Sequence, residues 1–271
     1  MNKAKTGQIS HRQLFCLLII IRLATLMLSA SVSYVQFAAE LSVTAVLSAA
    51  AFFTVKITDG TYPKAVKILL AVLFAASPFA DLFSYYQFTT QVAHPEVPVW
   101  VIGIVLAGFS VYSGLLKTEA VARFSALAVT VVLLCIGLTV LTNIKEIRPD
   151  FFAAAQNEKI DLASLIKCFD VPILYLLLAP KTSEHAGRSL TFGVAASYSV
   201  YIGVVMMCRA VLGKTVNYYK SPVFALFQLG EAGNFTKLDL LYICTVLVLL
   251  FCELSLAVSI FAETFKKKVK C

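Results

Sequence analysis

Charged residues are scarce in this sequence of 271 residues. Asp, Glu, Lys and Arg make up only 14% of it, while hydrophobic residues make up 59% and the mean hydropathy is +0.85. Soluble domains carry about 25% charged residues, because their surfaces face water. A chain with so little charge is not a water-soluble enzyme, and we interpret it as an all-α integral membrane protein whose main partner is the lipid bilayer.

Signatures of catalysis and metal binding are also lacking. We find no phosphate-binding glycine loop, no nucleophile elbow and no HExxH motif, and the three histidines fall in expected loops. The seven cysteines form no CxxC pair and have no nearby histidine, so we interpret them as small buried apolar residues. We therefore expect no catalytic residue, no metal site and no cofactor.

The net charge of +8 does not indicate nucleic-acid binding. A nucleic-acid-binding protein gathers its basic residues on one face, whereas here they lie between hydrophobic runs. We expect no nucleic-acid partner and read the basic residues as markers of membrane topology.

Eight hydrophobic runs have nearly the length of about 20 residues that a helix needs to cross a bilayer. They lie near residues 14–33, 38–56, 65–86, 98–116, 121–142, 161–180, 189–212 and 239–262. The first run is longer than the core of a signal peptide, so we count it as a span. The expected organisation is a cytoplasmic amino terminus (1–13), a membrane domain of about eight spans (14–262) and a basic cytoplasmic tail (263–271).

Lys and Arg set the expected orientation, because they are enriched in cytoplasmic loops. With the amino terminus inside, the inner segments hold Lys3, Lys5, Arg12, Lys56, Lys64, Lys67, Lys117, Arg123, Lys181, Arg188, Lys266, Lys267, Lys268 and Lys270. The outer segments hold fewer, and the short loop 87–97 has none. Both termini are therefore predicted to be cytoplasmic.

Two further patterns concern packing. Residues 221–227 are apolar but too short to span, which indicates an interfacial or re-entrant helix. Small residues four apart allow helices to approach closely in lipid, as in Gly103 with Ala107, Ser110 with Gly114, and Gly193 with Ser197.

Ionisable residues inside a span are costly and are therefore candidates for function. The sequence offers Arg22, Asp81, Lys167, Asp170 and Glu253. Glu253 must be protonated, reached by water or paired across helices, with Arg22 as one partner. Arg22 and Asp81 have the alternative of reaching the headgroups from within their spans.

The sixth run holds the most informative pattern, Lys167-Cys168-Phe169-Asp170-Val171-Pro172. Proline lacks a backbone donor and crowds the carbonyl four residues earlier, so we expect this helix to kink or open next to the charges. Openings of this kind expose backbone groups to ligands in transporters with broken helices. The alternative is that Lys167 and Asp170 neutralise each other.

Several short pieces carry a resemblance to a known family. They are ISHRQLF at 9–15 with IRLAT at 21–25, EAVAR at 119–123, SPVF at 221–224, GEAGNF at 230–235 and LD at 238–239. This pattern, over about residues 9–265, resembles the B-subunit family of bacterial spore germinant receptors, the spore germination permeases of the amino acid, polyamine and organocation transporter superfamily.

The resemblance implies a transporter-type inverted-repeat fold, here lacking the last two helices of a ten-span family. It implies broken first and sixth spans around a small-molecule site, which the third and eighth spans also line. It also implies a location in the spore inner membrane beside A-type and C-type receptor subunits. The chain departs from the family at Ala24, where glycine is usual, and at Glu253, where a basic residue is usual.

We therefore expect a germinant receptor subunit that binds a small nutrient, an amino acid, and triggers germination. The expected ligand-binding residues are Leu23, Ala24, Thr25, Asp81, Phe169, Asp170, Pro172 and Glu253. Two alternatives stay open: an amino-acid transporter coupled to protons through Asp170 or Glu253, and a degenerate structural subunit.

Overall fold

The protein is described by a computed structural model. The structure describes residues 9–28, 32–93, 98–151, 162–182, 185–230 and 238–265. These residues form helices, with one isolated bridge between Ile9 and Thr182. Most of the expected cytoplasmic amino terminus and basic tail, residues 1–8 and 266–271, lies outside the described part.

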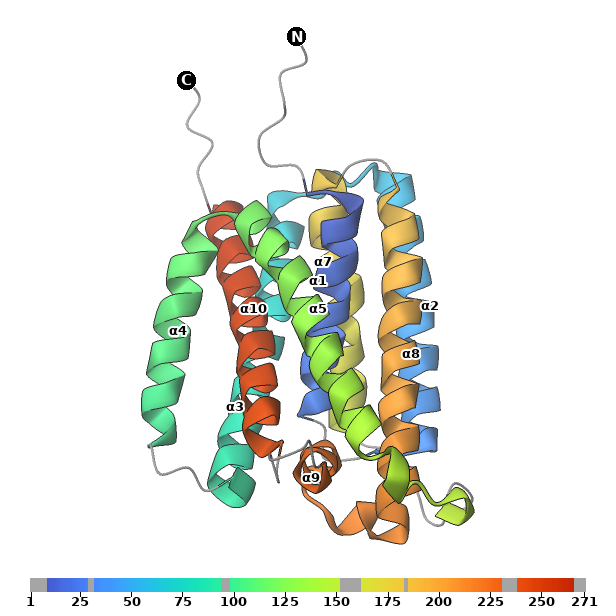
Figure 1. The fold of residues 1–271 in the computed structure, drawn as a ribbon. Helices are drawn as coiled ribbons and strands as arrows, with labels where there is room; N and C mark the ends of the chain where they lie inside the picture. The colour runs from blue at the N-terminus through green and yellow to red at the C-terminus, as the bar shows by residue number, and fades with distance from the viewer. Residues whose placement is uncertain are drawn as a thin grey trace.

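The long helices run in alternating directions through one bundle (Figure 1). Their bounds are α1 His11–Met27, α2 Tyr34–Thr58, α3 Lys64–Phe88, α4 Val99–Leu115, α5 Thr118–Thr142, α8 Ala186–Leu212 and α10 Asp239–Phe265. Shorter helices are α6 Leu162–Ile166, α7 Asp170–Leu178 and α9 Pro222–Leu229. A helix therefore occupies each of the eight hydrophobic runs of the sequence.

Five of these helices are long and apolar enough to cross a membrane, namely α2, α3 with its extension to Val92, α5, α8 with its extension to Tyr218, and α10. This result confirms an all-α integral membrane protein. The other three runs contain shorter helices: α1 and α4 have 17 residues each, and the sixth run is divided between α6 and α7. The count of eight spans stays a prediction.

Contacts between loops show which segments share an end of the bundle. At one end, Ile9 pairs with Thr182, Ser189 Oγ donates to the His11 carbonyl, and Lys181 pairs with Glu263. At the other end, the Arg148 amide donates to the Ala210 carbonyl. The segments predicted to be cytoplasmic thus meet at one end, which is the grouping that alternating crossings produce.

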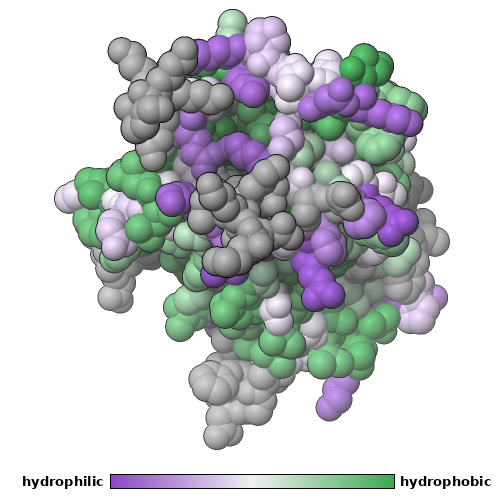
Figure 2. Space-filling view, turned by 90° about the horizontal axis from the view of Figure 1, so that it is seen from above, coloured by the Kyte–Doolittle hydropathy of each residue, from purple (hydrophilic) through white to green (hydrophobic). Residues whose placement is uncertain are grey.

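Polar residues gather on the end where α1 begins and α10 finishes, and apolar residues surround them (Figure 2). Large apolar side chains are also exposed along the flanks of the outer helices, including Phe53 on α2, Phe83 on α3, Phe109 on α4 and Leu134 on α5. An apolar flank below a polar end is the surface that a bilayer requires.

α1 runs through the interior and packs against α5, α7, α8 and α10. Residues from Leu17 to Met27 are all buried, so this helix is apolar on every side except at Arg22 and Thr25. It is continuous from His11 to Met27, which contradicts the opened first span implied by the resemblance. Ala24, unlike glycine, favours the helical backbone and so removes the usual reason for an opening.

The sixth run tightens near the predicted point but does not open. α6 leads into one 3₁₀ turn at Lys167–Phe169, and α7 then begins at Asp170. Pro172 lies in the first turn of α7, where its missing N–H would have no helical partner in any case. The chain therefore accommodates the proline by starting a new helix, so the expected unwinding does not occur.

The predicted short helix at 221–227 is present as α9, which begins with Pro222 after Ser221. Its residues Val223 to Phe227 are buried, and it packs against α8 and α10 at the end of the bundle opposite the polar face (Figure 1). Tyr242 of α10 lies among its aromatic rings and donates a hydrogen bond to the carbonyl of Met27. Tyr242 thus connects α9 with the last turn of α1.

Two of the three predicted small-residue contacts hold α4 and α8 in place. A Cβ on Gly114 would lie 2.6 Å from Val258 of α10, and one on Gly193 would lie 3.2 Å from Leu18 of α1. A Cβ on Gly103 would meet nothing within 4 Å, so this glycine makes no such contact with a neighbouring helix.

Candidate buried charge site

Arg22 lies in the middle of α1 and forms an ion pair with Glu40, in the second turn of α2. Both side chains are 3% exposed. Gln36 Nε2 donates to the second oxygen of Glu40 at 2.6 Å. Because α1 is enclosed by other helices, Arg22 cannot reach the headgroups, and it does not pair with Glu253.

Two tyrosines of α8 complete the surroundings of Arg22. Its guanidinium lies 4.9 Å from the ring centre of Tyr198 and 5.5 Å from that of Tyr201. The Tyr198 hydroxyl donates to the Glu40 carbonyl at 3.0 Å, and it lies 2.6 Å from the Thr44 hydroxyl. Aromatic faces and a carboxylate together offset the loss of water around this cation.

A second ion pair joins Lys167, in the 3₁₀ turn, to Asp81 of α3. The Asp81 side chain is fully buried, which excludes the alternative that it reaches the headgroups. Three residues beyond Lys167, Asp170 accepts a hydrogen bond from Ser77 of α3 at 2.5 Å. The alternative, an ion pair of Lys167 with Asp170, is therefore not what forms: both side chains contact α3.

Glu253 lies in the middle of α10 and is completely buried. Neither of its oxygens has a hydrogen-bond partner among the described residues, and the same holds for Asp81 Oδ2. The charged groups whose fields act on Glu253 are Asp81, Asp170 and Lys167. Glu253 therefore belongs to the same cluster, without a cation of its own.

The buried charges of this cluster do not balance. It contains the cations Arg22 and Lys167 and the carboxyl groups Glu40, Asp81, Asp170 and Glu253. Arg22 compensates Glu40, and Lys167 compensates Asp81. Asp170 and Glu253 are then left without an ion-pair partner among the described residues, and such groups are costly away from water. The cluster can take up a cation or protons.

The predicted site residues divide into two groups. Asp81, Asp170 and Glu253 come together from α3, α7 and α10, and Pro172 is buried two residues after Asp170. Leu23 and Ala24 pack in the apolar core, and Thr25 Oγ1 bonds to its own helix at the Ile21 carbonyl. Phe169 is 46% exposed, because it lies on the outer side of the 3₁₀ turn.

Sequence reasoning missed Glu40, Ser77, Tyr198 and a second buried cation, Arg209. Glu40 lies inside the expected span 38–56, and this position was the signal that should have marked it. Arg209 of α8 contacts the Val32 carbonyl at 3.4 Å and lies 5.1 Å from the ring centre of Tyr34. Ser77 and Tyr198 carry no charge, so no pattern in the sequence distinguished them.

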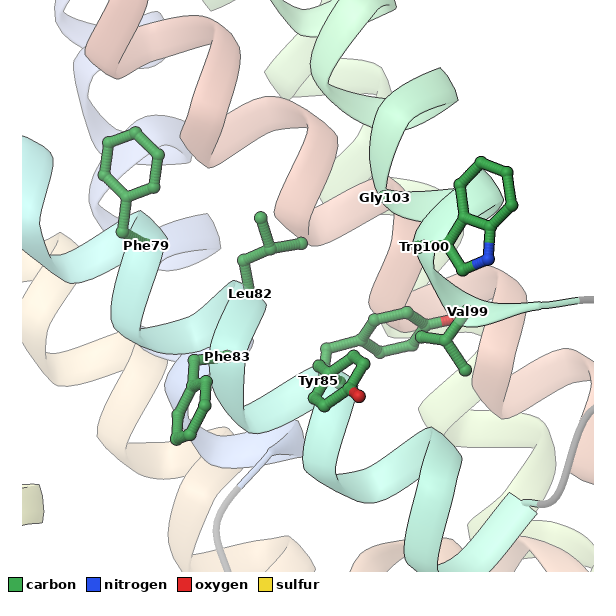
Figure 3. Close-up of a pocket in the computed structure, with 8 residues that line it drawn as sticks. Phe79, Leu82, Phe83, Tyr85, Val99, Trp100 and Gly103 are labelled. Atoms are coloured by element: carbon green, nitrogen blue, oxygen red, sulfur yellow. The ribbon is translucent and has the colours of Figure 1, made fainter.

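An apolar hollow on the outer surface has a different chemistry. It has a volume of about 280 Å³ and lies between α3 and α4, lined by aromatic and aliphatic residues that include Phe79, Phe83 and Trp100 (Figure 3). Such a surface suits lipid chains, but it has no charged side chain that could bind a charged nutrient. The charge cluster is therefore the candidate site for a polar ligand.

Among the described residues, no three His, Cys, Asp or Glu side chains are placed to hold a metal ion. No family model and no curated protein sequence matches this chain.

Proposed function

We propose that this chain is the membrane subunit of a spore germinant receptor that binds a small nutrient, an amino acid, and triggers germination. The observation that carries the proposal is the buried charge cluster, to which α1, α3, α7 and α10 each contribute a charged residue. These helices correspond to the four spans that the family resemblance assigns to the ligand site.

The imbalance of charge in the cluster gives the ligand its chemical class. Among the described residues Asp170 and Glu253 form no ion pair, and the ammonium group of an amino acid would supply a partner. Burial makes that attraction stronger than it is in water. An amine with a small side chain fits this requirement better than an anion, which four carboxyl groups would repel.

The ligand would act by stabilising one of two arrangements of the helices. The division between α6 and α7 is the natural place for a change, because α7 begins with Asp170 and is joined to α6 by a single 3₁₀ turn. Receptor subunits of the A and C types in the spore inner membrane would read that change as the signal.

The test is Asp170→Ala, with Asp150→Asn as a control at an exposed position outside the cluster. We expect Asp170→Ala to abolish the germination response to amino acids while the protein stays in the membrane at its normal level. The control should respond like the unchanged protein. A normal response of the Asp170 variant would contradict the proposal, and loss of the variant from the membrane would assign Asp170 a structural role.

A second candidate, a proton-coupled amino-acid transporter, is favoured by Glu253 and Asp81. Both carboxyl groups are buried and have oxygens without a hydrogen-bond partner among the described residues, so a proton taken up there would remove a costly buried charge. In liposomes with an inward proton gradient, a transporter would concentrate an amino acid, and Glu253→Gln would remove this uptake. A receptor subunit would bind the amino acid without flux, and a structural subunit would not bind it.

A further inference from the structure

α1 and α8 begin side by side at the polar end of the bundle, and a cleft of about 360 Å³ lies between their first turns. Four basic or titratable side chains line it: His11 and Arg12 of α1, His185 at the start of α8, and Arg188. Phe15 and Phe192 form its wall toward the middle of the bundle. A positively charged rim therefore lies directly above an aromatic wall.

A hydrogen bond between the first turns of α1 and α8 fixes this arrangement. Ser189 is buried and its hydroxyl donates to the His11 carbonyl at 2.8 Å, which ties the first turn of α8 to that of α1. His185 begins α8 without a side-chain hydrogen bond, and its carbonyl accepts from the amides of Arg188 and Ser189. Both helices start at the cleft; α1 is capped by the Ser10 hydroxyl, which accepts from the Gln13 amide, so Arg12 and Arg188 supply the charge for an anion.

No acidic side chain lines the cleft, and none of its four basic or titratable side chains forms an ion pair within the described part of the chain. Arg12 and Arg188 are exposed, and Phe192, one turn further along α8, is 65% exposed on the apolar flank. The charge is thus free for a ligand that carries a phosphate and lies along the bilayer.

From this geometry we infer that the cleft between α1 and α8 binds one anionic phospholipid. The phosphate lies between Arg12 and Arg188, and an acyl chain lies along Phe192. Basic pockets between helices at the cytoplasmic side of a membrane are suited to such headgroups, and this end of the bundle is the one predicted to be cytoplasmic. The inference does not depend on the proposed function.

The test compares the purified protein with two double variants that each remove two positive charges from the same end of the bundle. Arg12→Gln with Arg188→Gln alters the cleft, and Lys56→Gln with Lys67→Gln alters exposed positions outside it. Native mass spectrometry from detergent counts bound phosphatidylglycerol and phosphatidylcholine at equal concentrations. Phe192→Ala is a third variant, which keeps both charges.

We expect the unchanged protein and the lysine variant to retain one phosphatidylglycerol in preference to phosphatidylcholine. The arginine variant should bind it roughly tenfold or more weakly, since each basic residue near the surface contributes on the order of 1 kcal/mol. Phe192→Ala should weaken binding with the charges intact. The inference would be overturned if the protein bound both lipids equally, or if the two double variants lost phosphatidylglycerol to the same extent. It would also be overturned if inorganic phosphate displaced all of the bound phosphatidylglycerol.

Discussion

Arg22 and Glu40 show how single residues hold this interior together. The pair is almost completely buried, so each charge depends on the other and on Tyr198. Removal of one partner leaves an uncompensated charge away from water, whereas removal of both does not.

We expect Arg22→Met to lower the free energy of unfolding by roughly 3–5 kcal/mol, and Glu40→Met to do the same. The double variant should recover most of that loss, because two apolar side chains can fill the space. Thermal unfolding in detergent gives the change in stability of the two single variants and the double variant. Additive losses in the double variant would contradict the pairing.

Residue chemistry also shows what the sequence could predict. Asp81, Asp170 and Glu253 were identified because charge inside a hydrophobic run is expensive, and the structure brings them together. Their partners could not be predicted, because pairing depends on how the helices are rotated in the bundle. Lys167 therefore pairs with Asp81 of α3 and not with Asp170 three residues away. Arg22 likewise pairs with Glu40, which sequence reasoning did not single out.

At the scale of helices, the contact of α4 with α10 depends on Gly114. A Cβ there would lie 2.6 Å from Val258 Cβ and 2.7 Å from the Ser255 carbonyl oxygen, so the helices would have to separate. Gly108 lies in the same helix, and a Cβ at that position would have nothing within 4 Å, so it is a matched control.

Gly114→Ala should destabilise the protein by about 1–3 kcal/mol, the usual cost of inserting a methyl group into a packed contact. Gly108→Ala should leave stability unchanged or raise it by up to about 1 kcal/mol, because alanine favours a helix. The midpoints of thermal unfolding give the comparison. Equal effects at both positions would show that α4 does not approach α10 in this way.

The positions of helices were easier to predict than their internal breaks. Hydrophobic length alone placed helices in all eight runs, since the bilayer sets that length. The proline rule predicted a kink or an opening in the sixth run, and the structure has a 3₁₀ turn there, with Pro172 accommodated in the first turn of α7. The first run was expected to open by family resemblance, and its own Ala24 favours the continuous α1.

For the whole molecule, contacts between loops group the starts of α1 and α8 and the last turn of α10 at one end of the bundle. The Lys and Arg distribution predicts that the end with the start of α1 is inside. In a variant without native cysteines, a cysteine at Gln91 or Asn157 should react with a reagent added from outside, and one at Glu184 should not. Asn157 and Glu184 lie outside the described residues, so Thr61, in the turn before α3, is a second inside probe. The opposite pattern would reverse the orientation.

The measurement that tests the central claim most directly is calorimetric binding of amino acids to the purified protein, without partner subunits. The buried charge cluster predicts saturable binding of at least one amino acid, which Asp170→Ala and Glu253→Gln each weaken while Asp150→Asn does not. The same ligand without its ammonium group should not bind. The proposal that this cluster is the nutrient site would be contradicted if both cluster variants bound the amino acid as tightly as the unchanged protein. It would also be contradicted if the ligand bound equally well without its ammonium group.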